Sequence, residues 1–174
     1  MMILKILITY HSHTGNTEKV AKCMKEGLEE EGQDVTLMPA KNVDPSSLSS
    51  YDLVLLGSGI YASNIGKDIT NLMKKTLNFA PKFAFFNTHT SPTAYQKAFS
   101  KISETIKQKN SIVLGEFDCI GENIGISKEQ QLMMASRLPP EQQQQQKKYL
   151  EQIKGRPNKK DLENAKKFAK SLVK

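Results

Sequence analysis

Five short apolar runs recur along the first two thirds of the chain, separated by segments whose apolar residues have helical spacing. The runs are residues 3–10, 33–38, 52–56, 82–87 and 111–117. Runs of this length that are rich in Ile, Leu, Val and Phe are typical of strands buried in a parallel sheet. Because helical segments lie between them, the pattern predicts an α/β fold, with a doubly wound five-stranded parallel sheet and helices on both faces.

Capping residues indicate where the intervening helices should begin. The first helix is expected over residues 16–31, where a glycine follows it. The second should begin after Ser63 or Asn64, since both are favourable N-cap residues. The third should begin after Ser91, because Pro92 would then occupy the first helical position.

Residues 121–160 have a different composition, polar and rich in Gln and Lys. Two helices are expected there, over residues 127–138 and 140–154, and the second contains the five-glutamine tract 142–146. This tract has low complexity and is expected to be exposed. The last helix is expected over residues 159–173, with its apolar side chains facing the sheet.

The length of 174 residues suits one domain, residues 1–174, with a polar Gln-rich insertion at about 120–158 before the last helix. No apolar run approaches the roughly 20 residues of a membrane span. The apolar run at 3–10 is too short for a signal peptide and no cleavage site follows it. Two cysteines, Cys23 and Cys119, fit a reducing compartment, so a cytoplasmic location is expected.

A polar loop separates the first run from the first helix. It consists of Ser12, His13, Thr14, Gly15, Asn16 and Thr17. The first N–H groups of a helix have no intrahelical partner and carry partial positive charge, so this loop is suited to an anion. Its hydroxyl and amide side chains add donors, and its glycine allows close backbone approach. No Lys or Arg lies between Lys5 and Lys19, which suits a buried phosphate monoester held by neutral dipoles.

The pattern Ser-x-Thr-Gly-Asn-Thr after a first strand resembles the phosphate-binding signature of the flavodoxin family. Residues 155–165 also resemble the closing segment of bacterial and archaeal flavodoxin-like proteins, so the resemblance covers residues 1–119 and 155–174. It implies the strand order 2-1-3-4-5 and an FMN cofactor whose 5′-phosphate binds at residues 12–17. A Ser/Thr-rich helix cap without a ligand is the alternative. The Walker A and dinucleotide-binding glycine patterns are absent from this loop.

Two further loops should meet the first, because the carboxyl ends of strands 1, 3 and 4 border one crevice in this strand order. The second loop consists of Gly57, Ser58, Gly59, Ile60 and Tyr61, and the third begins with Asn87, Thr88, His89 and Thr90. The resemblance implies that a carbonyl of the second loop accepts a hydrogen bond from N5–H of the reduced flavin. The third loop would face the pyrimidine side. Tyr61 is a candidate for ring stacking, with core packing as its alternative, and for Tyr95 a core role is favoured over stacking.

All three histidines of the chain lie in these loops, namely His11, His13 and His89. Imidazole is a common metal ligand, but residues 10–17, 57–66 and 87–95 contain no Asp, Glu or Cys. No metal site is therefore expected.

The lack of carboxylates in the three loops bears on redox chemistry. The net charge is +7, whereas electron-carrying flavodoxins are commonly acidic. Nearby carboxylates disfavour an anionic reduced flavin, so a second reduction step less negative than in acidic flavodoxins is expected. The lysines are spread over helix faces without an interleaved aromatic pattern, so no nucleic-acid partner is expected.

The resemblance therefore implies an FMN-binding electron-transfer protein. Its partners would be redox proteins, such as flavin or iron–sulfur reductases and acceptor enzymes. The sequence contains no nucleophile–base pattern, so no catalytic residue is assigned and enzymatic activity stays open. The alternative is an FMN-dependent NAD(P)H:quinone reductase or a related flavoenzyme oxidase, an oxidoreductase of the same fold. A phosphoacceptor receiver is rejected, because Tyr10-His11 and Gly57-Ser58 occupy the positions that would need acidic residues. The sequence specifies neither the electron donor and acceptor nor the oligomeric state.

Overall fold

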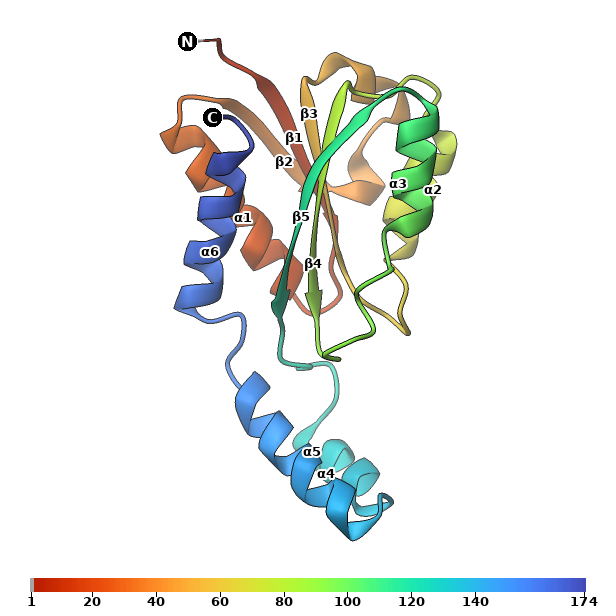
Figure 1. Cartoon of the computed structure of the whole chain (residues 1–174), viewed down its shortest axis with the longest axis vertical. Helices are drawn as coiled ribbons and strands as arrows, with labels where there is room; N and C mark the ends of the chain where they lie inside the picture. Colours follow the sequence, from red (N-terminus) through yellow and green to blue (C-terminus); the bar gives the residue numbers. More distant parts are fainter. Residues whose placement is uncertain (1) are drawn as a thin grey trace.

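A parallel sheet lies between two pairs of helices, and a helical hairpin extends from one end of the sheet (Figure 1). The computed structural model describes residues 2–174. The strands are β1 (Lys5–His11), β2 (Asp34–Pro39), β3 (Leu53–Gly59), β4 (Lys82–His89) and β5 (Ile112–Ile120). All neighbouring pairs are parallel and the order is β2-β1-β3-β4-β5. The predicted fold class and strand order are confirmed.

Two helices cover each face of the sheet. Helices α1 (Asn16–Glu30) and α6 (Lys159–Ser171) pack on one face, and α2 (Lys67–Lys75) and α3 (Ser100–Gln108) pack on the other (Figure 1). The connection from β2 to β3 contains two short 3₁₀ segments, Ala40–Asn42 and Pro45–Ser50. The hairpin consists of α4 (Lys128–Ser136) and α5 (Pro140–Ile153). These helices agree with the expectations for residues 16–31, 127–138, 140–154 and 159–173 to within a few residues.

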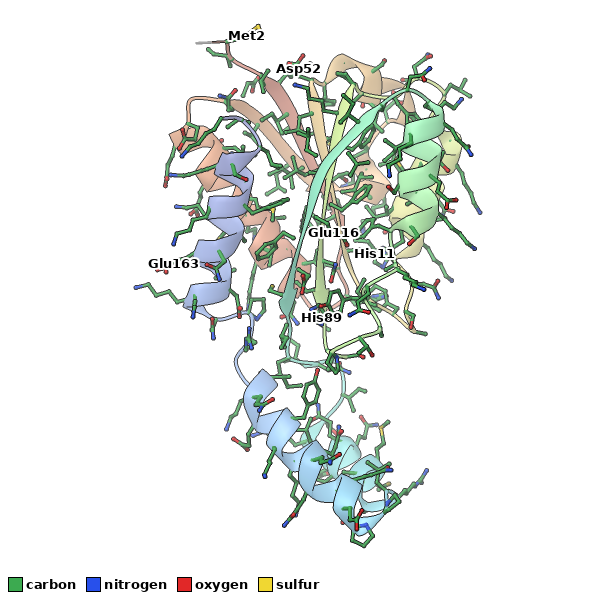
Figure 2. The ribbon with its side chains drawn as sticks, viewed as in Figure 1. Met2, His11, Asp52, His89, Glu116 and Glu163 are labelled. Carbon is green, nitrogen blue, oxygen red and sulfur yellow. The ribbon has the colours of Figure 1, made fainter. Side chains whose placement is uncertain are left out.

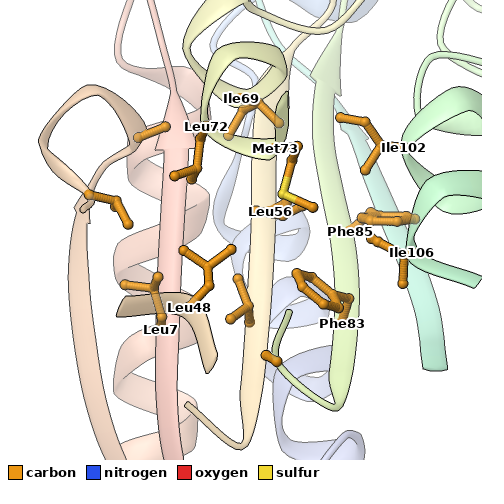
Figure 3. Close-up of a cluster of buried hydrophobic side chains, with 14 of the residues drawn as sticks. Leu7, Leu48, Leu56, Ile69, Leu72, Met73, Phe83, Phe85, Ile102 and Ile106 are labelled. Carbon is orange, nitrogen blue, oxygen red and sulfur yellow. The ribbon is translucent and has the colours of Figure 1, made fainter. Parts of the chain in front are cut away.

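Side chains that alternate along the strands divide the core into two halves. Leu7 of β1 points to α2 and α3, whereas Ile6 and Ile8 point to α1 and α6. Figure 3 shows the first half, where Leu56, Phe83 and their neighbours lie under Ile69, Leu72, Met73, Ile102 and Ile106. Burial of each such side chain stabilises the fold by about 1.5–3 kcal/mol, so the sheet is a rigid support for the loops at its ends.

Ion pairs join the first and last helices of the chain. Glu30 of α1 accepts hydrogen bonds from Lys166 at 2.7 Å and contacts Lys170 at 2.6 Å, both on α6. Hydrogen bonds from these two lysines lower the pKa of Glu30 to about 2. The small Gly27 lets α6 approach closely, because a Cβ atom there would lie 2.8 Å from the side chain of Lys166.

Two predicted helix starts are wrong. Helix α2 begins at Lys67, after Gly66, and not after Ser63 or Asn64. Asn64 instead pairs with Tyr61 in an isolated bridge, and Ser63 has a left-handed φ of 66°, so neither residue can cap a helix. Both residues belong to a tight turn that directly follows the second loop.

The third predicted helix begins eight residues later than expected, because α3 starts at Ser100 and not at Pro92. The hydroxyl of Ser91 does accept from the N–H groups of Thr93 at 3.3 Å and Ala94 at 3.2 Å, as an N-cap would. The chain does not continue this turn as a helix. Tyr95 stacks on His89 with ring centroids 3.7 Å apart, and this contact holds the segment over the end of β4.

The helical hairpin has little core of its own. Its buried residues are Ala135 and Ile153, while Leu132, Met133 and Met134 of α4 are exposed. Ser127 caps α4 with a capping box. Among residues 2–174 no helix is long and apolar enough to cross a membrane.

Candidate functional site

A cavity of about 110 Å³ opens where β1, β3 and β4 end. Its walls come from the three predicted loops and from the chain that follows β5. The lining residues are Ser12, Thr14, Asn16, Thr17, Gly59, Ile60, Tyr61, Thr88, His89, Thr90, Gly121, Glu122 and Asn123. All but the last three belong to the site predicted from the sequence. The three loops therefore meet at one cavity, as expected.

The start of α1 offers unpaired donors to this cavity. Gly15 is the N-cap residue, with a left-handed φ of 91° and no side-chain cap, and its N–H donates to Oγ of Ser12 at 3.1 Å. The first intrahelical bond runs from the N–H of Lys19 to the carbonyl of Gly15. Within the described residues, the N–H groups of Asn16, Thr17 and Glu18 have no hydrogen-bond acceptor. These donors and the positive end of the helix dipole suit a phosphate group.

The side chains of Asn16 and Thr17 are engaged elsewhere. Nδ2 of Asn16 donates to the carbonyl of Glu122 at 2.8 Å, and the hydroxyl of Thr17 is 2.8 Å from that of Thr88. They connect the start of α1 to β4 and to the chain after β5. These two side chains therefore fix the shape of the cavity, while their backbone N–H groups stay free.

The second loop is fixed by a buried hydroxyl. Ser58 lies inside β3 and is fully buried. Its Oγ donates to the carbonyl of Gly59 at 2.6 Å and accepts from the N–H of Gly66 at 2.8 Å. Gly57 is also in β3, and a Cβ atom there would lie 2.0 Å from the ring of Phe86. Neither Gly57 nor Ser58 lines the cavity, and the role of their carbonyls toward a flavin stays a prediction.

Aromatic rings gather beside the first loop. Tyr61 packs edge-on against His13 at 4.7 Å and His11 at 5.6 Å, measured between ring centroids. Its hydroxyl accepts from the N–H of His13 at 3.3 Å. Burial raises the pKa of this hydroxyl, and the hydrogen bond from His13 partly offsets the effect. His11 in turn contacts Asp68 of α2, with Nδ1 and Oδ2 2.9 Å apart.

His89 is held from three sides at the end of β4. Its Nδ1 lies 2.7 Å from the carbonyl oxygen of Ser91, and its Nε2 lies 2.8 Å from Oδ2 of Asp118 on β5. The carbonyl oxygen of Ser91 can only accept, so Nδ1 is the donor in that hydrogen bond. Tyr95 stacks on its face. The sequence favoured a core role for Tyr95 over stacking on a cofactor. In the structure the ring of Tyr95 lies over His89. A contact between Tyr95 and a cofactor stays a prediction.

Asn87 lies one layer deeper than the loop residues. Its side chain is fully buried, Nδ2 donates to Glu116 at 3.3 Å, and Oδ1 has no hydrogen-bond partner among residues 2–174. Burial raises the pKa of Glu116 despite this hydrogen bond, and the charge of Asp118 adds to the rise. Figure 2 shows His11, His89 and Glu116 gathered near this end of the sheet.

The expectation of a carboxylate-free site needs correction. The three loops themselves contain no acidic residue, but neighbouring segments bring Asp68, Asp118 and Glu122 to them. Two of these carboxylates face a histidine. Among residues 2–174, no group of three or more His, Cys, Asp or Glu side chains could hold a metal ion. Burial raises the pKa of Cys119 to about 12, with Asp161 and Asp118 adding to the rise, so its thiol is not a nucleophile.

No sequence motif marks Gly121, Glu122 and Asn123. They belong to the neck, which we define as residues 121–123 and 154–156, where the hairpin joins the sheet. The N–H of Glu122 donates to the carbonyl of Arg156 at 2.7 Å, and its carboxylate accepts from the N–H of Gly155 at 2.8 Å. The predicted place of β5 in the sheet could have located these residues. They follow the carboxyl end of β5, which lies at the same edge of the sheet as the three loops.

Larger hollows adjoin the small cavity. One of about 360 Å³ lies between the neck and the hairpin and shares Glu122 and Asn123 with it. Another, of about 850 Å³, separates α5 from residues 90–92. The cavity of about 110 Å³ has room for a phosphate group and part of a chain, and a complete nucleotide would extend into the neighbouring open groove.

Comparisons with known proteins agree with this architecture. The chain matches the family model of the flavodoxin domain over residues 7–170. It is 30% identical over 173 residues to an uncharacterised protein of Methanocaldococcus jannaschii, covering 98% of this chain and 99% of that one. It is 27% identical over 179 residues to BilS, a flavodoxin-like domain-containing protein of Clostridioides difficile, covering 98% and 97%. The fold of oxidised flavodoxin 2 from Bacillus cereus is similar, with a TM-score of 0.67 at 19% identity over 97% of both chains. The chain belongs to the flavodoxin family.

Proposed function

We propose that this protein binds FMN and carries electrons between redox partner proteins. The observation that carries the proposal is the set of unpaired N–H groups in the first turn of α1, whose residues Asn16 and Thr17 line a cavity shared by three strand ends. A phosphate monoester is the anion that such neutral donors suit. Membership of the flavodoxin family supports FMN as the molecule that carries this phosphate.

The residues present fit FMN in their chemistry. The hydroxyls of Ser12 and Thr14 and the N–H groups of α1 would hold the phosphate, and Tyr61 borders the adjoining groove where a flat ring would lie. When bound, FMN supplies the electron-transfer chemistry. The protein orients it through Ser58 and Thr17, which fix the second loop and the start of α1.

A comparison of FMN with riboflavin tests the phosphate site. Apoprotein is titrated with each flavin and the quenching of flavin fluorescence is followed. Riboflavin lacks the phosphate, so we expect it to bind at least about 100-fold more weakly.

Thr14→Asp places a carboxylate in the cavity and should weaken FMN binding at least tenfold while leaving riboflavin binding unchanged. Thr105→Asp, on the exposed face of α3, is the matched control and should bind FMN like the unmodified chain. Equal affinities for the two flavins would exclude this phosphate site.

An anaerobic reductive titration tests the electron-transfer role. We expect the absorbance of a half-reduced flavin to accumulate before full reduction, as one-electron carriage requires. A direct passage to the two-electron form, together with rapid NAD(P)H-dependent reduction of quinones, would favour the quinone reductase instead. A protein that neither contains flavin nor takes up added FMN would refute the proposed function.

A further inference from the structure

One face of the sheet carries a large surplus of lysines. Residues 67–109, which form α2, β4 and α3, contain eight lysines and two carboxylates, so their net charge is +6; residues 121–174 also carry +6, and the rest of the chain is negative. We call these lysines the basic face. They are Lys67, Lys74, Lys75, Lys82, Lys97, Lys101, Lys107 and Lys109, and all are exposed.

The basic face is not neutralised within the molecule. In the part of the chain that the structure describes, none of its lysines forms an ion pair. Asp68 is turned to His11, which leaves Glu104 as the one acidic residue of the segment without such a partner. On the opposite face the lysines of α6 lie beside the glutamate-rich α1, and two of them, Lys166 and Lys170, pair with its glutamates.

Helix stability explains some of these lysines but not all. Lys74, Lys75 and Lys107 lie in the last turns of α2 and α3, where a cation is favourable to the helix dipole. Lys67 is the first residue of α2 and Lys101 the second of α3. There the dipole is positive, so a cation is unfavourable by a few tenths of a kcal/mol or more.

The cations at the helix starts border the candidate site. Lys67 directly follows Gly66, whose N–H is held by Ser58 of the second loop. Lys97 comes two residues after Tyr95, which stacks on His89 of the third loop. Lys101 lies in the first turn of α3, four residues after Lys97.

We infer that Lys67, Lys97 and Lys101 dock an acidic redox protein beside the flavin. This inference rests on the proposed function, and it adds the kind of partner that the site receives. Exposed like charges that no carboxylate neutralises create a positive field that steers an acidic surface to this edge of the sheet. The contribution is to the association rate, and salt screens it over a Debye length of about 8–10 Å.

Two forms of one electron acceptor test the sign of this field. The FMN-loaded protein is reduced and mixed in a stopped-flow instrument with native cytochrome c, which is basic, or with succinylated cytochrome c, which is acidic. We expect the rate with the acidic form to fall at least fivefold between 20 and 300 mM NaCl, and the rate with the basic form to rise. A rate with the acidic form that is independent of salt would overturn the inference.

Charge-reversal variants locate the field. The triple variant Lys67→Glu, Lys97→Glu, Lys101→Glu should lower the rate with the acidic acceptor at least tenfold at 20 mM NaCl. The control triple, Lys159→Glu, Lys167→Glu, Lys174→Glu, makes the same change in net charge on exposed lysines at the opposite face and should lower it less than threefold. Equal effects of the two triples would show that net charge alone acts, and would overturn docking at the basic face.

Binding without electron transfer separates this inference from the proposed function. Calorimetric titration of the apoprotein with succinylated cytochrome c should show salt-dependent binding that the first triple variant abolishes and the control triple retains. If the protein takes up no FMN, the proposed function fails whatever this titration shows. If it binds FMN but the two triples behave alike, only the docking inference fails. Tighter binding of a 20-base-pair DNA duplex than of the acidic cytochrome would also overturn it.

Discussion

At the scale of single residues, Gly15 connects backbone geometry to the candidate phosphate site. Its φ is 91° and a Cβ atom there would meet nothing within 4 Å, so Gly15→Ala costs only the strain of a left-handed alanine, about 1–2 kcal/mol. Gly32, with a φ of 76° and equally open space after α1, is the matched control. We expect both alanine variants to lose similar free energy of unfolding in urea. Only Gly15→Ala should weaken FMN binding.

The paired design separates stability from the site. If Gly32→Ala weakened FMN binding as much as Gly15→Ala, the loss would come from a general loss of stability. If Gly15→Ala left FMN binding unchanged, the conformation at the start of α1 would not matter to the phosphate.

Sequence reasoning found those site residues that follow one another along the chain. The loop from Ser12 to Thr17 was recognisable, because its donors and its glycine are contiguous. Asp118 and Glu122 were not found, since they reach His89 and Asn16 from 29 and 106 residues away. Only the lateral order of the strands brings such residues together, and no local pattern encodes which side chain a neighbouring strand presents.

At the scale of elements, the contact between α1 and α6 should make stability depend on pH. The folded-state pKa of Glu30 is about 2, below its ordinary value of 4.5. A carboxylate with a lowered pKa stabilises the fold above its ordinary pKa, and that contribution is lost as the pH falls toward the folded-state pKa. We therefore expect the free energy of unfolding to fall between pH 5 and pH 2, and to fall less in Glu30→Gln.

Glu163→Gln is the control for this pH dependence. Glu163 lies on α6, points away from the sheet in Figure 2 and forms no ion pair with another described residue. Its variant should follow the unmodified chain from pH 5 to pH 2 in urea titrations. Addition of 0.5 M NaCl should reduce the difference between Glu30→Gln and the unmodified chain, because the groups are exposed.

The hairpin should be dispensable for folding but not for the site. Replacement of residues 124–152 by Gly-Ser-Gly keeps Glu122, its two hydrogen bonds across the neck and the buried Ile153. Since Ala135 is the only buried residue that this replacement removes, we expect the free energy of unfolding to change by no more than about 1 kcal/mol. FMN should bind more weakly, because the hollows beside the cavity lose one wall. A variant that fails to fold would show that the hairpin supports the sheet.

The limits of the elements were harder to predict than their existence. Strands β3 and β4 extend to Gly59 and His89, two or three residues beyond the apolar runs, because pairing with a neighbour continues the ladder through polar residues. Conversely, Ser91 and Pro92 are a favourable helix start, but a ring stacked on His89 keeps the next residues in turns. In both cases contacts between segments decided against the local preference.

At the scale of the whole molecule, charge and the candidate site are arranged together. One face of the sheet is joined by ion pairs between α1 and α6, while the other carries the unpaired lysines of the basic face. Both faces end at the same edge, where Asp68 and Asp118 are each held by a histidine. Because these carboxylates have partners and the protein is positive, the expected second reduction step stays less negative than in acidic flavodoxins. Potentiometry of the FMN-loaded protein tests this expectation.

The molecule should also unfold locally in two tiers. The apolar residues of β1, β3 and β4 that face the helices are almost fully buried, whereas the hairpin buries only Ala135 and Ile153. Local opening free energies follow such differences in burial, so the amides of α4 and α5 should exchange at least about 100-fold faster than those of the central strands. Hydrogen exchange measured by mass spectrometry resolves the segments. FMN should slow exchange at residues 12–17 and 121–123 and leave the C-terminal turn of α2 unchanged. Uniform protection would instead mean that hairpin and sheet form one cooperative unit.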